Sequence, residues 1–437
     1  MKVVIMAGGK GTRISSLFSD IPKPMIKIDD RPVLEHEIEC LRRQGFTDII
    51  ITISHLGKVI TDYFGDGSGV SPATGKPFGV NIEYFNEEVP LGNAGALFKL
   101  KDKLTDDFLL LNADAIFDID FRRFVNYHKS HGGDVTLFTH PNSHPYDSGL
   151  IIADDNSRVL SWLTKEDPRP EYYDNRVNAG LHVLSPRVLE ESNISPDEVG
   201  MPGPDGKPLK VDLDRKLLKP LAGTGRMYCY DSPEYVKDMG TPERFESVRK
   251  DFLSGIVASK NLCNRQKAIF LDRDGTLNRY VGFLRDIKEF ELLPGVSEAI
   301  RLINASGYLA VVITNQPVIA RGEVTVEQLD EIHKKMATEL GKDGAYLDAV
   351  YYCPHHPDKG FEGEVAELKF DCDCRKPKPG LLLRAASDLN IDLSESYMIG
   401  DSHIDVEAGE NAGCKASFLI PRNEDDALLD CVRSILQ

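Results

Sequence analysis

The feature that most constrains the fold is an alternation of short apolar runs with longer amphipathic stretches. The apolar runs that we interpret as strands in the first half of the chain lie at 3–6, 49–53, 108–112 and 134–138. Helical patterns lie between them, for instance at 33–44 and 121–128. Such alternation predicts a mainly parallel sheet with helices on both faces, so this half is expected to form an α/β domain.

The alternation stops and then starts again. The segment 253–266 has no strong period, and a new strand pattern follows at 268–271. Later strand patterns lie at 309–314, 349–352 and 397–400. A sheet that restarts in this way indicates a second domain, and 437 residues are enough for two separate cores. We therefore expect two α/β domains, at residues 1–255 and 265–437.

Four soft metal ligands are grouped in pairs in the second domain. Cys353 and His355 form one pair, and Cys372 and Cys374 form the other. Two pairs of sulfur and nitrogen ligands suit a closed tetrahedral Zn²⁺ site, which is structural rather than catalytic. His356 is an alternative to His355, and spacing alone does not separate them. The competing interpretation is a set of unrelated reduced cysteines.

Two carboxylates, Asp272 and Asp274, directly follow the strand pattern at 268–271. Open α/β sheets bind their ligands at this edge. Carboxylates two positions apart can divide the work of phosphate-ester hydrolysis, because one can attack phosphorus while the other handles protons. A surface turn rich in Asp and Gly is the alternative.

Later strand ends, and the end of the cysteine loop, carry further groups suited to a phosphate. They supply a hydroxyl, an amide, two cations and a carboxylate for a metal ion: Thr314, Asn315, Arg375, Lys376 and Asp401. Together with the two aspartates, these groups predict a phosphatase site that uses Mg²⁺, which prefers oxygen ligands and accepts phosphate as a further ligand.

These motifs resemble the haloacid dehalogenase superfamily over residues 265–437. Within it they resemble the zinc-loop phosphatases that include the heptose 1,7-bisphosphate 7-phosphatases. The resemblance implies a Rossmannoid sheet with a zinc loop, in which Asp272 is the nucleophile and Asp274 the general acid and base. It also implies that Asp272, the backbone carbonyl of Asp274 and Asp401 hold Mg²⁺. Thr314 and Lys376 would then bind the transferred phosphoryl group.

By the same resemblance, Arg375 would contact the remote part of the substrate. Asp405 is interpreted as a carboxylate at a helix start and is not counted as a ligand. The chain departs from the family after Asn315-Gln316, where it has Pro317-Val318 in place of Ser-Gly. This departure is expected to alter substrate preference, and histidinol-phosphate phosphatases remain the alternative for this domain.

A glycine-rich turn follows the first strand pattern. Residues 7–13 read Ala-Gly-Gly-Lys-Gly-Thr-Arg, and Lys23 follows between two prolines. Glycines let the backbone approach a triphosphate, and consecutive amides can bind its oxygens. Arg13 and Lys23 add charged donors. The spacing is not that of a Walker loop.

Asp114 and Asp238 each lie at the end of a strand pattern. Together they can converge on one Mg²⁺ that bridges a nucleotide and a sugar phosphate. Each alone would be read as a solvated loop carboxylate. Their occurrence with the glycine-rich turn favours the metal site.

The N-terminal motifs resemble those of sugar-1-phosphate nucleotidyltransferases over residues 1–250, with further matches at 91–95, 178–180 and 238–242. The resemblance implies a Rossmann-like mixed sheet. It also implies that a sugar phosphate attacks the α-phosphorus of a nucleoside triphosphate and releases pyrophosphate, while Arg13 and Lys23 stabilise the transition state.

The resemblance also assigns binding residues in the first domain. Lys165 would bind the phosphate of the sugar, although Thr164-Lys165-Glu166 replaces the usual Glu-Lys-Pro and leaves this lysine open by one or two positions. The other residues expected to bind the nucleotide or the sugar are Gly8, Gly9, Gly11, Gly92, Asn93, Asn178 and Gly180.

Composition excludes some classes of partner. A net charge of −17 argues against nucleic acid or an acidic membrane, and the sequence has no apolar stretch of membrane-spanning length. Of eight cysteines, those outside the paired set are scattered singly, as in a reducing compartment, so we expect a cytoplasmic enzyme. The sequence leaves open whether the chain forms a homo-oligomer.

Considered together, the two domains predict consecutive steps. A phosphatase that removes one phosphate from heptose 1,7-bisphosphate would supply the sugar 1-phosphate that a nucleotidyltransferase consumes. The resemblance points to GTP as the donor and to GDP-heptose as the product. The alternatives are a mannose- or glucose-1-phosphate nucleotidyltransferase fused to another phosphatase, and a non-catalytic sensor of nucleotide sugars.

Overall fold

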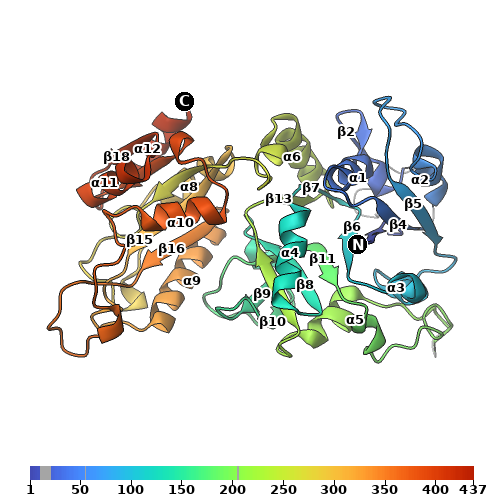
Figure 1. Ribbon diagram of the computed structural model, residues 1–437, viewed down its shortest axis with the longest axis horizontal. Helices are drawn as coiled ribbons and strands as arrows, with labels where there is room; N and C mark the ends of the chain where they lie inside the picture. The colour runs from blue at the N-terminus through green and yellow to red at the C-terminus, as the bar shows by residue number, and fades with distance from the viewer. Residues whose placement is uncertain (10–20, 55, 204–205) are drawn as a thin grey trace. The chain divides into compact units, whose positions relative to one another are not determined.

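The computed structural model describes the chain except residues 10–20, 55 and 204–205 (Figure 1). It contains two compact units. Unit 1 comprises Met1–His140, Ile151–Trp162 and Asn178–Asn261, and unit 2 comprises Pro141–Leu150, Leu163–Val177 and Leu262–Gln437. The chain therefore leaves unit 1 after Asn261, inside the segment 253–266, which has no strong hydrophobic period. Unit 2 also takes two segments from the first half of the chain.

The sheet of unit 1 is mixed and has nine strands among the described residues. Its main path is β10-β9-β11-β6-β1-β4-β5, and β8 pairs with both β11 and β12. The neighbours β5, β4, β1 and β6 are parallel, as the alternation predicts, whereas β11 is antiparallel to β6. The strands are β1 Val3–Met6, β4 Asp48–Ile53, β5 Asn81–Asn86, β6 Phe108–Asn112, β8 Val135–His140, β9 Leu150–Ala153, β10 Val159–Leu163, β11 Val177–Leu184 and β12 Met227–Asp231.

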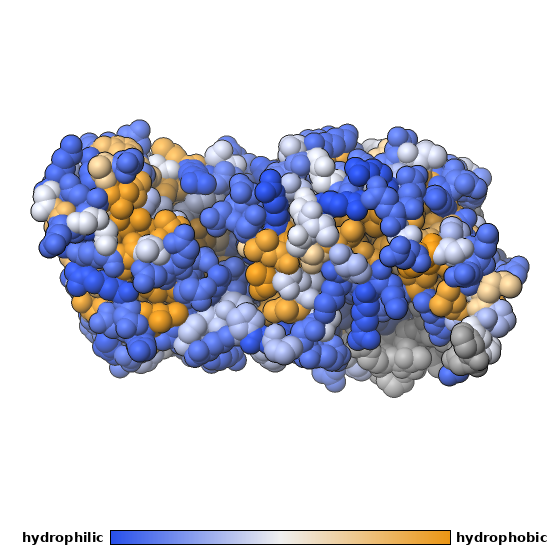
Figure 2. All heavy atoms as spheres, turned by 90° about the horizontal axis from the view of Figure 1, so that it is seen from below, coloured by the Kyte–Doolittle hydropathy of each residue, from blue (hydrophilic) through white to orange (hydrophobic). Residues whose placement is uncertain are grey.

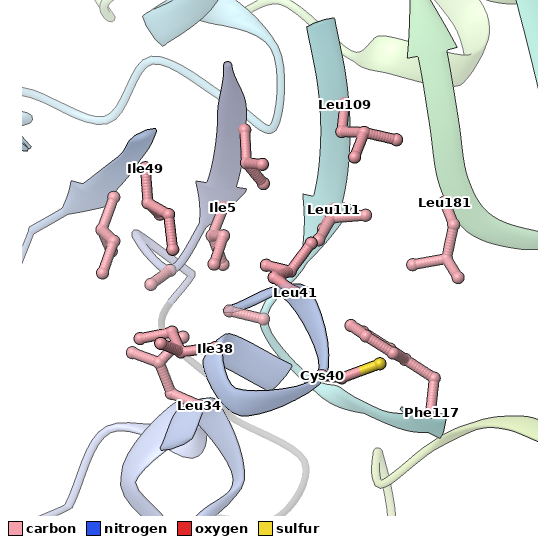
Figure 3. Packing of buried hydrophobic residues seen from close by; sticks show 14 of the residues in the cluster. Ile5, Leu34, Ile38, Cys40, Leu41, Ile49, Leu109, Leu111, Phe117 and Leu181 are labelled. Carbon is pink, nitrogen blue, oxygen red and sulfur yellow. The ribbon is translucent and has the colours of Figure 1, made fainter. Parts of the chain in front are cut away.

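Helix α1 covers one face of this sheet, and its apolar residues follow the helical period. Leu34, Ile38 and Leu41 point towards Ile5 and Ile49 of the central strands (Figure 3). The helix spans Val33–Arg43, close to the predicted 33–44, and α4 extends three residues beyond the predicted end. The helices of unit 1 are α1, α2 Gly57–Phe64, α3 Gly95–Lys99, α4 Phe121–His131, α5 Arg187–Glu190, α6 Pro242–Leu253, α7 Ile256–Ser259 and the π-helix η4 Leu213–Leu218.

Two small ribbons stand beside the main sheet. The pair β7 (Ala115–Asp118) and β13 (Tyr235–Asp238) is antiparallel, and the other pair is β2 (Lys27–Ile28) with β3 (Arg31–Pro32). The first ribbon matters for the predicted magnesium site because it sets Asp238 opposite Ala115, next to Asp114.

The sheet of unit 2 has five parallel strands in the order β16-β15-β14-β17-β18. The strands are β14 Lys267–Leu271, β15 Tyr308–Asn315, β16 Ala349–Cys353, β17 Tyr397–Gly400 and β18 Ala416–Leu419. The helices are α8 Val296–Asn304, α9 Val326–Lys342, α10 Gly380–Asp388, α11 His403–Ala412 and α12 Ala427–Leu436 (Figure 1).

The two faces of this sheet belong to separate apolar clusters. Ile269 and Leu271 of β14 pack with residues of α8, α9 and α12, while Ala268 and Phe270 pack with residues of α10 and α11. Successive side chains of a strand point to opposite faces, so a strand buried on both sides is apolar throughout. Unit 2 is therefore a three-layer α/β fold.

Hydrophilic side chains cover much of the face seen in Figure 2, with hydrophobic side chains in patches between them. Over the described part of the chain, no helix combines the length and apolar character needed to cross a membrane.

Candidate active sites

The predicted phosphatase residues meet at the carboxyl edge of the unit 2 sheet. Asp272 follows the last residue of β14, Thr314 lies at the end of β15, and Asp401 follows β17. Parallel strands end at the same edge, so residues far apart in the sequence come together there.

Lys376 lies between two buried carboxylates at this edge. Its Nζ is 2.7 Å from Asp272 Oδ1 and 2.6 Å from Asp405 Oδ1, and it donates to the Ile313 carbonyl at 2.8 Å. The side chains of Lys376 and Asp405 are both 1% exposed. Burial opposes the charge on Lys376, but the two carboxylates outweigh it and raise the pKa of the amine.

For Asp272, burial outweighs the neighbouring charges and favours the neutral form. It raises the pKa of this carboxyl from 3.8 to about 6, with a contribution from Asp405, although Lys376 opposes the shift. Asp272 therefore binds a proton far more readily than an exposed aspartate. Added positive charge at this site would favour its ionised form.

Three carboxylates form a group that suits a divalent cation. Asp272, Asp401 and Asp405 each offer an oxygen within 4.8 Å of the others. Hard oxygen donors suit Mg²⁺. Asp405 was not counted as a ligand from the sequence, yet it belongs to this group. Asp274 was expected to contribute its backbone carbonyl, and that role stays a prediction.

Two neighbours lie against the Asp401 carboxylate. Arg422 Nε donates to its Oδ2, and Gly275 lies so close that a Cβ at position 275 would overlap the same oxygen. Gly275 has φ of +91°, which favours glycine. Burial raises the pKa of Asp401, Arg422 opposes the shift and Asp272 adds to it.

The Asp274 carboxylate is fixed by three donors. Arg273 Nη2 is 2.7 and 3.0 Å from its two oxygens, Asn278 Nδ2 donates at 3.0 Å and Gln316 Nε2 donates at 2.8 Å. Burial alone would raise the pKa of Asp274, but Arg273 and the two amides lower it overall. Asp274 is therefore held as a carboxylate, the form in which it can act as a base.

Asn315 and Thr314, both predicted to bind substrate, form hydrogen bonds at this edge. The Asn315 side chain donates to the Lys376 carbonyl at 3.1 Å and accepts from the Lys376 N–H at 3.0 Å. Thr314 is buried and its Oγ1 accepts from Gln316 Nε2 at 2.9 Å. The amide of Asn315, predicted to bind substrate, here positions the backbone of Lys376.

The four soft ligands of the cysteine loop come together. Cys353, His355, Cys372 and Cys374 each offer an atom within 4.8 Å of the others, whereas His356 Nδ1 accepts from the Asp358 N–H. The sulfur–sulfur distances are 3.1, 3.2 and 3.5 Å. Zn–S bonds of about 2.3 Å in a tetrahedron would set the sulfurs roughly 3.8 Å apart. A small expansion would therefore fit Zn²⁺ with His355 as the nitrogen ligand.

The cluster of soft ligands is connected to the buried Lys376. Lys376 lies two residues after Cys374, and Arg375 Nη1 donates to the His355 carbonyl at 3.3 Å. The cluster thus fixes the backbone that carries both predicted cations.

Unit 1 contains a cavity of about 740 Å³ at the ends of β1, β4 and β6. The predicted residues that line it are Gly8, Gly9, Lys23, Gly92, Asn93 and Asp114. Arg13 and Gly11 lie outside the described residues, so their roles stay predictions. The volume suits a nucleotide-sized ligand.

Lys23 and Asp114 face each other in this cavity. Lys23 lies in the short 3₁₀ turn η1 (Lys23–Met25), and its Nζ is 2.9 Å from Asp114 Oδ2. Asp238 lies close by, because the Met239 N–H donates to the Asp114 carbonyl at 3.0 Å. The Asp238 carboxylate pairs with Arg244 at 2.9 Å. Both aspartates predicted to share Mg²⁺ thus lie in one region, each beside a cation.

Only some of the amino acids that were predicted to bind the sugar phosphate lie near the cavity. Gly180 has φ of +76°, and a Cβ there would lie 2.5 Å from Nδ2 of Asn112, which lines the cavity. Asn178 Oδ1 is 3.1 Å from Nε2 of His182, whose pKa burial lowers to about 3. Lys165 is exposed and belongs to unit 2. Among the described residues it does not line the cavity, and its role stays a prediction.

Sequence reasoning missed three groups at these sites. Asp405 was interpreted through its position at a helix start, and it does accept from the Ser402 N–H there. Gln316 was quoted only as part of a motif. Glu87 was not considered, and only its place just before the predicted 91–95 segment could have drawn attention to it.

Comparison with known proteins identifies both units. A family model described as nucleotidyl transferase matches residues 2–252, and one described as HAD-hydrolase-like matches 373–424. The first covers more than half of the chain, which therefore belongs to the nucleotidyl transferase family, with a haloacid dehalogenase-like hydrolase in the same chain.

Curated relatives define the two activities further. A D-glycero-beta-D-manno-heptose-1,7-bisphosphate 7-phosphatase of Pasteurella multocida is 46% identical over 155 residues, which cover 36% of this chain and 82% of the relative. A mannose-1-phosphate guanyltransferase of Saccharomyces cerevisiae is 32% identical over 270 residues, which cover 61% of this chain and 67% of the relative. The chain is thus a bifunctional enzyme, a nucleotidyltransferase joined to a phosphatase.

Solved structures were found for each half. HddC from Yersinia pseudotuberculosis is 24% identical, with a TM-score of 0.45, and covers 57% of this chain and 99% of its own. D,D-heptose 1.7-bisphosphate phosphatase from B. bronchiseptica, complexed with magnesium and phosphate, is 32% identical, with a TM-score of 0.34, and covers 39% of this chain and 99% of its own.

Proposed function

We propose that the chain removes the 7-phosphate from D-glycero-α-D-manno-heptose 1,7-bisphosphate and then transfers GMP from GTP to the resulting heptose 1-phosphate. The product, GDP-heptose, would serve surface polysaccharide such as lipopolysaccharide, and the reactions would take place in the cytoplasm. The observation that carries the proposal is the presence, in one chain, of a phosphatase similar to heptose bisphosphatases and a transferase similar to a guanyltransferase.

In unit 2, Asp272 is the nucleophile of the proposed reaction. Lys376 holds its Oδ1, so the other oxygen is the one that attacks phosphorus, and the bond to the sugar oxygen breaks. Asp274 supplies a proton to the leaving oxygen and later takes one from the attacking water. Arg273 lowers the pKa of Asp274 and so favours its ionised form. Asp274 must therefore gain a proton before it can act as the acid.

The residues that would hold Mg²⁺ in unit 2 are Asp272, Asp401 and Asp405. When bound, Mg²⁺ supplies positive charge to the phosphoryl oxygens. Lys376 and Thr314 supply further donors on the same side, and Cys353, His355, Cys372 and Cys374 would hold Zn²⁺ in a structural role.

In unit 1, the cavity binds the nucleotide and Lys23 neutralises phosphate charge as pyrophosphate leaves. Asp114 and Asp238 would hold a second Mg²⁺. The chain's own residues act mainly by orienting the two substrates for in-line attack.

The configuration at C1 links the two steps. Removal of the 7-phosphate breaks no bond at C1, so both sites must accept the same anomer. The phosphatase relatives carry the β configuration in their names, whereas the proposal specifies α. Both anomers must therefore be tested.

The proposal is tested by incubating the chain with each heptose 1,7-bisphosphate anomer, GTP and Mg²⁺, and measuring phosphate and nucleotide sugar. We expect both products from the α anomer. Phosphate without nucleotide sugar from either anomer contradicts the coupled function. Asp272→Asn should stop phosphate release and leave transfer to added heptose 1-phosphate intact.

Transfer to mannose 1-phosphate is the second candidate, favoured by the 32% identity to a mannose-1-phosphate guanyltransferase. A panel of sugar 1-phosphates with GTP decides between the two. A kcat/KM for mannose 1-phosphate above that for heptose 1-phosphate would replace the proposed acceptor.

A further inference from the structure

The side chain of Arg273 is completely buried in unit 2, a position that arginine rarely occupies. Arg273 lies between Asp272 and Asp274 in the turn after β14, and its side chain is 0% exposed. A buried guanidinium needs acceptors for its N–H groups, because these groups lose their hydrogen bonds to water on folding. The acceptors around Arg273 therefore indicate what this buried cation does.

Among the described residues, two side chains contact the nitrogens of this guanidinium. Nη2 donates to the two oxygens of Asp274 at 2.7 and 3.0 Å, and Nη1 lies 3.2 Å from Nε2 of His333. Nε of Arg273 has no hydrogen-bond partner in the described part of the chain. Because a guanidinium is planar and rigid, its orientation is fixed by Asp274 on one side and by His333 on the other.

The chemistry of this pair determines which ring nitrogen of His333 carries the proton. Burial, together with the positive charge of Arg273, lowers the pKa of His333 to about 3, so the ring is neutral at neutral pH. Arginine has no acceptor, so Nε2 accepts from Nη1 and the proton of the ring lies on Nδ1. His333 therefore serves Arg273 as an acceptor and adds no charge to the site.

His333 also connects Asp274 to a helix. It lies in α9, where its neighbour Ile332 is buried in the apolar core of unit 2. The other side chains that donate to Asp274 belong to Asn278 and Gln316, and both of these residues lie in loops. Groups held by helices and strands are positioned more precisely than groups held by loops. The contact through His333 is thus the one that ties Asp274 to regular structure.

We propose that His333 is a positioning residue of the phosphatase: it orients Arg273, which holds the Asp274 carboxylate where it can give a proton to the leaving sugar oxygen. This proposal rests on the phosphatase reaction proposed above and adds a residue that acts through a neighbour. Without the acceptor on His333, the buried Nη1 would turn towards another acceptor or water, and Nη2 would turn with it. A displacement of about 1 Å at a reacting group can lower a rate roughly 100-fold.

The leaving group provides a test that separates positioning from folding. When the bond between phosphorus and the sugar oxygen breaks, that oxygen takes the proton of Asp274. Acetyl phosphate releases acetate instead, which is stable without a proton at neutral pH. Misplacement of Asp274 should therefore lower kcat/KM for a sugar phosphate much more than kcat/KM for acetyl phosphate. A smaller folded fraction lowers both values equally, so their ratio reports positioning.

Three substitutions of His333 are compared in the full-length chain with Mg²⁺. His333→Leu removes the acceptor, and His333→Asn carries an amide that is too short to reach Nη1. Both should lower kcat/KM for heptose 1,7-bisphosphate roughly 10- to 100-fold and that for acetyl phosphate by less than about threefold. His333→Gln places an acceptor oxygen close to the position of Nε2, so its ratio should stay within about threefold of that of the unchanged chain. Ile332→Val, on the same helix but in the apolar core, is the matched control and should keep the ratio while it lowers stability.

Each outcome bears on a separate statement. If the unchanged chain releases phosphate from neither substrate, the proposed phosphatase function fails and the role of His333 fails with it. If the unchanged chain is active but His333→Leu and His333→Asn keep the ratio of the two substrates, the histidine is only structural and the proposal is overturned. If His333→Leu does not fold, the pair His333→Asn and His333→Gln decides: a lower ratio for asparagine alone supports the proposal, and equal ratios overturn it.

Discussion

Replacing Asp272 by asparagine is expected to make unit 2 more stable at pH 8 while it removes phosphatase activity. The pKa of Asp272 is raised by burial from 3.8 to about 6 in the folded chain. Its folded pKa lies above its unfolded pKa, so its contribution to stability is full below about pH 4 and is lost as the pH rises through 6. At pH 8 the ionised carboxylate therefore destabilises the fold relative to a neutral side chain.

The size of this effect follows from the shift. A change from 3.8 to about 6 corresponds to roughly 3 kcal/mol, since each pKa unit is about 1.4 kcal/mol. Asparagine has nearly the same shape and no charge, and Lys376 keeps Asp405 and the Ile313 carbonyl as partners. For a domain of this size, 3 kcal/mol is roughly 6–12 °C in Tm. The gain should disappear near pH 4, where Asp272 itself is protonated.

Asp274→Asn is the matched control because it should act in the opposite direction. The pKa of Asp274 is lowered in the fold, so its ionised form stabilises unit 2 above pH 4, and this contribution is lost as the pH falls through its folded pKa. Its removal also leaves the fully buried Arg273 without its carboxylate, which typically costs about 3–5 kcal/mol.

The assay is hydrogen exchange of the β14 and β15 amides, supported by calorimetry, at pH 4 and pH 8 in buffer without Mg²⁺. The reasoning is refuted if Asp272→Asn is no more stable than the unchanged chain at pH 8, or if the two variants shift stability in the same direction. Added Mg²⁺ should narrow the gap, because it binds the unchanged chain and stabilises it by mass action.

Three further substitutions should each affect one of the two sites and not the other. Cys374→Ser should weaken zinc binding and lower phosphatase kcat at least tenfold, because Lys376 loses its fixed backbone, while nucleotidyl transfer stays unchanged; zinc content and both rates report this. Gly275→Ala should destabilise unit 2 by about 1–3 kcal/mol and weaken Mg²⁺ activation, since φ is +91° and the Cβ would overlap Asp401; melting curves and Mg²⁺ titrations measure it. Lys23→Met should lower transfer by roughly 10²- to 10³-fold and leave phosphate release intact, as product assays on one preparation would show.

The sequence predicted those parts of the molecule whose signals are local. The central strands β14 and β15 of unit 2 are buried on both faces and are therefore continuous apolar runs, such as Leu309–Ile313 within β15. The paired cysteines and the two aspartates after β14 are also local patterns. Strand β11 was not predicted, because its Asn178-Ala179-Gly180 segment interrupts the apolar pattern where the backbone approaches Asn112.

The remainder depends on tertiary contacts. Asp405 accepts from the N-terminus of its helix and contacts Lys376 with its other oxygen, and a helix-start aspartate looks the same in sequence with or without the second contact. Likewise, nothing in 141–150 or 163–177 distinguishes these segments from the rest of the first half, although they belong to unit 2.

Both sites pair a lysine with an aspartate predicted to hold a metal ion, but the two lysines differ in how firmly they are held. Lys376 is buried and has Asp405 and the Ile313 carbonyl besides Asp272, so it should remain in place when a cation binds. Lys23 lines an open cavity, and Asp114, its ion-pair partner in the described part of the chain, is 41% exposed. A cation on Asp114 would repel the Lys23 ammonium, which we expect to turn towards the phosphates of the nucleotide. A structure with Mg²⁺ and GTP should therefore show the contact of 2.9 Å between Lys23 and Asp114 broken and that of 2.7 Å between Lys376 and Asp272 kept. If Lys23 stays on Asp114 with nucleotide bound, its proposed role in neutralising phosphate charge is wrong.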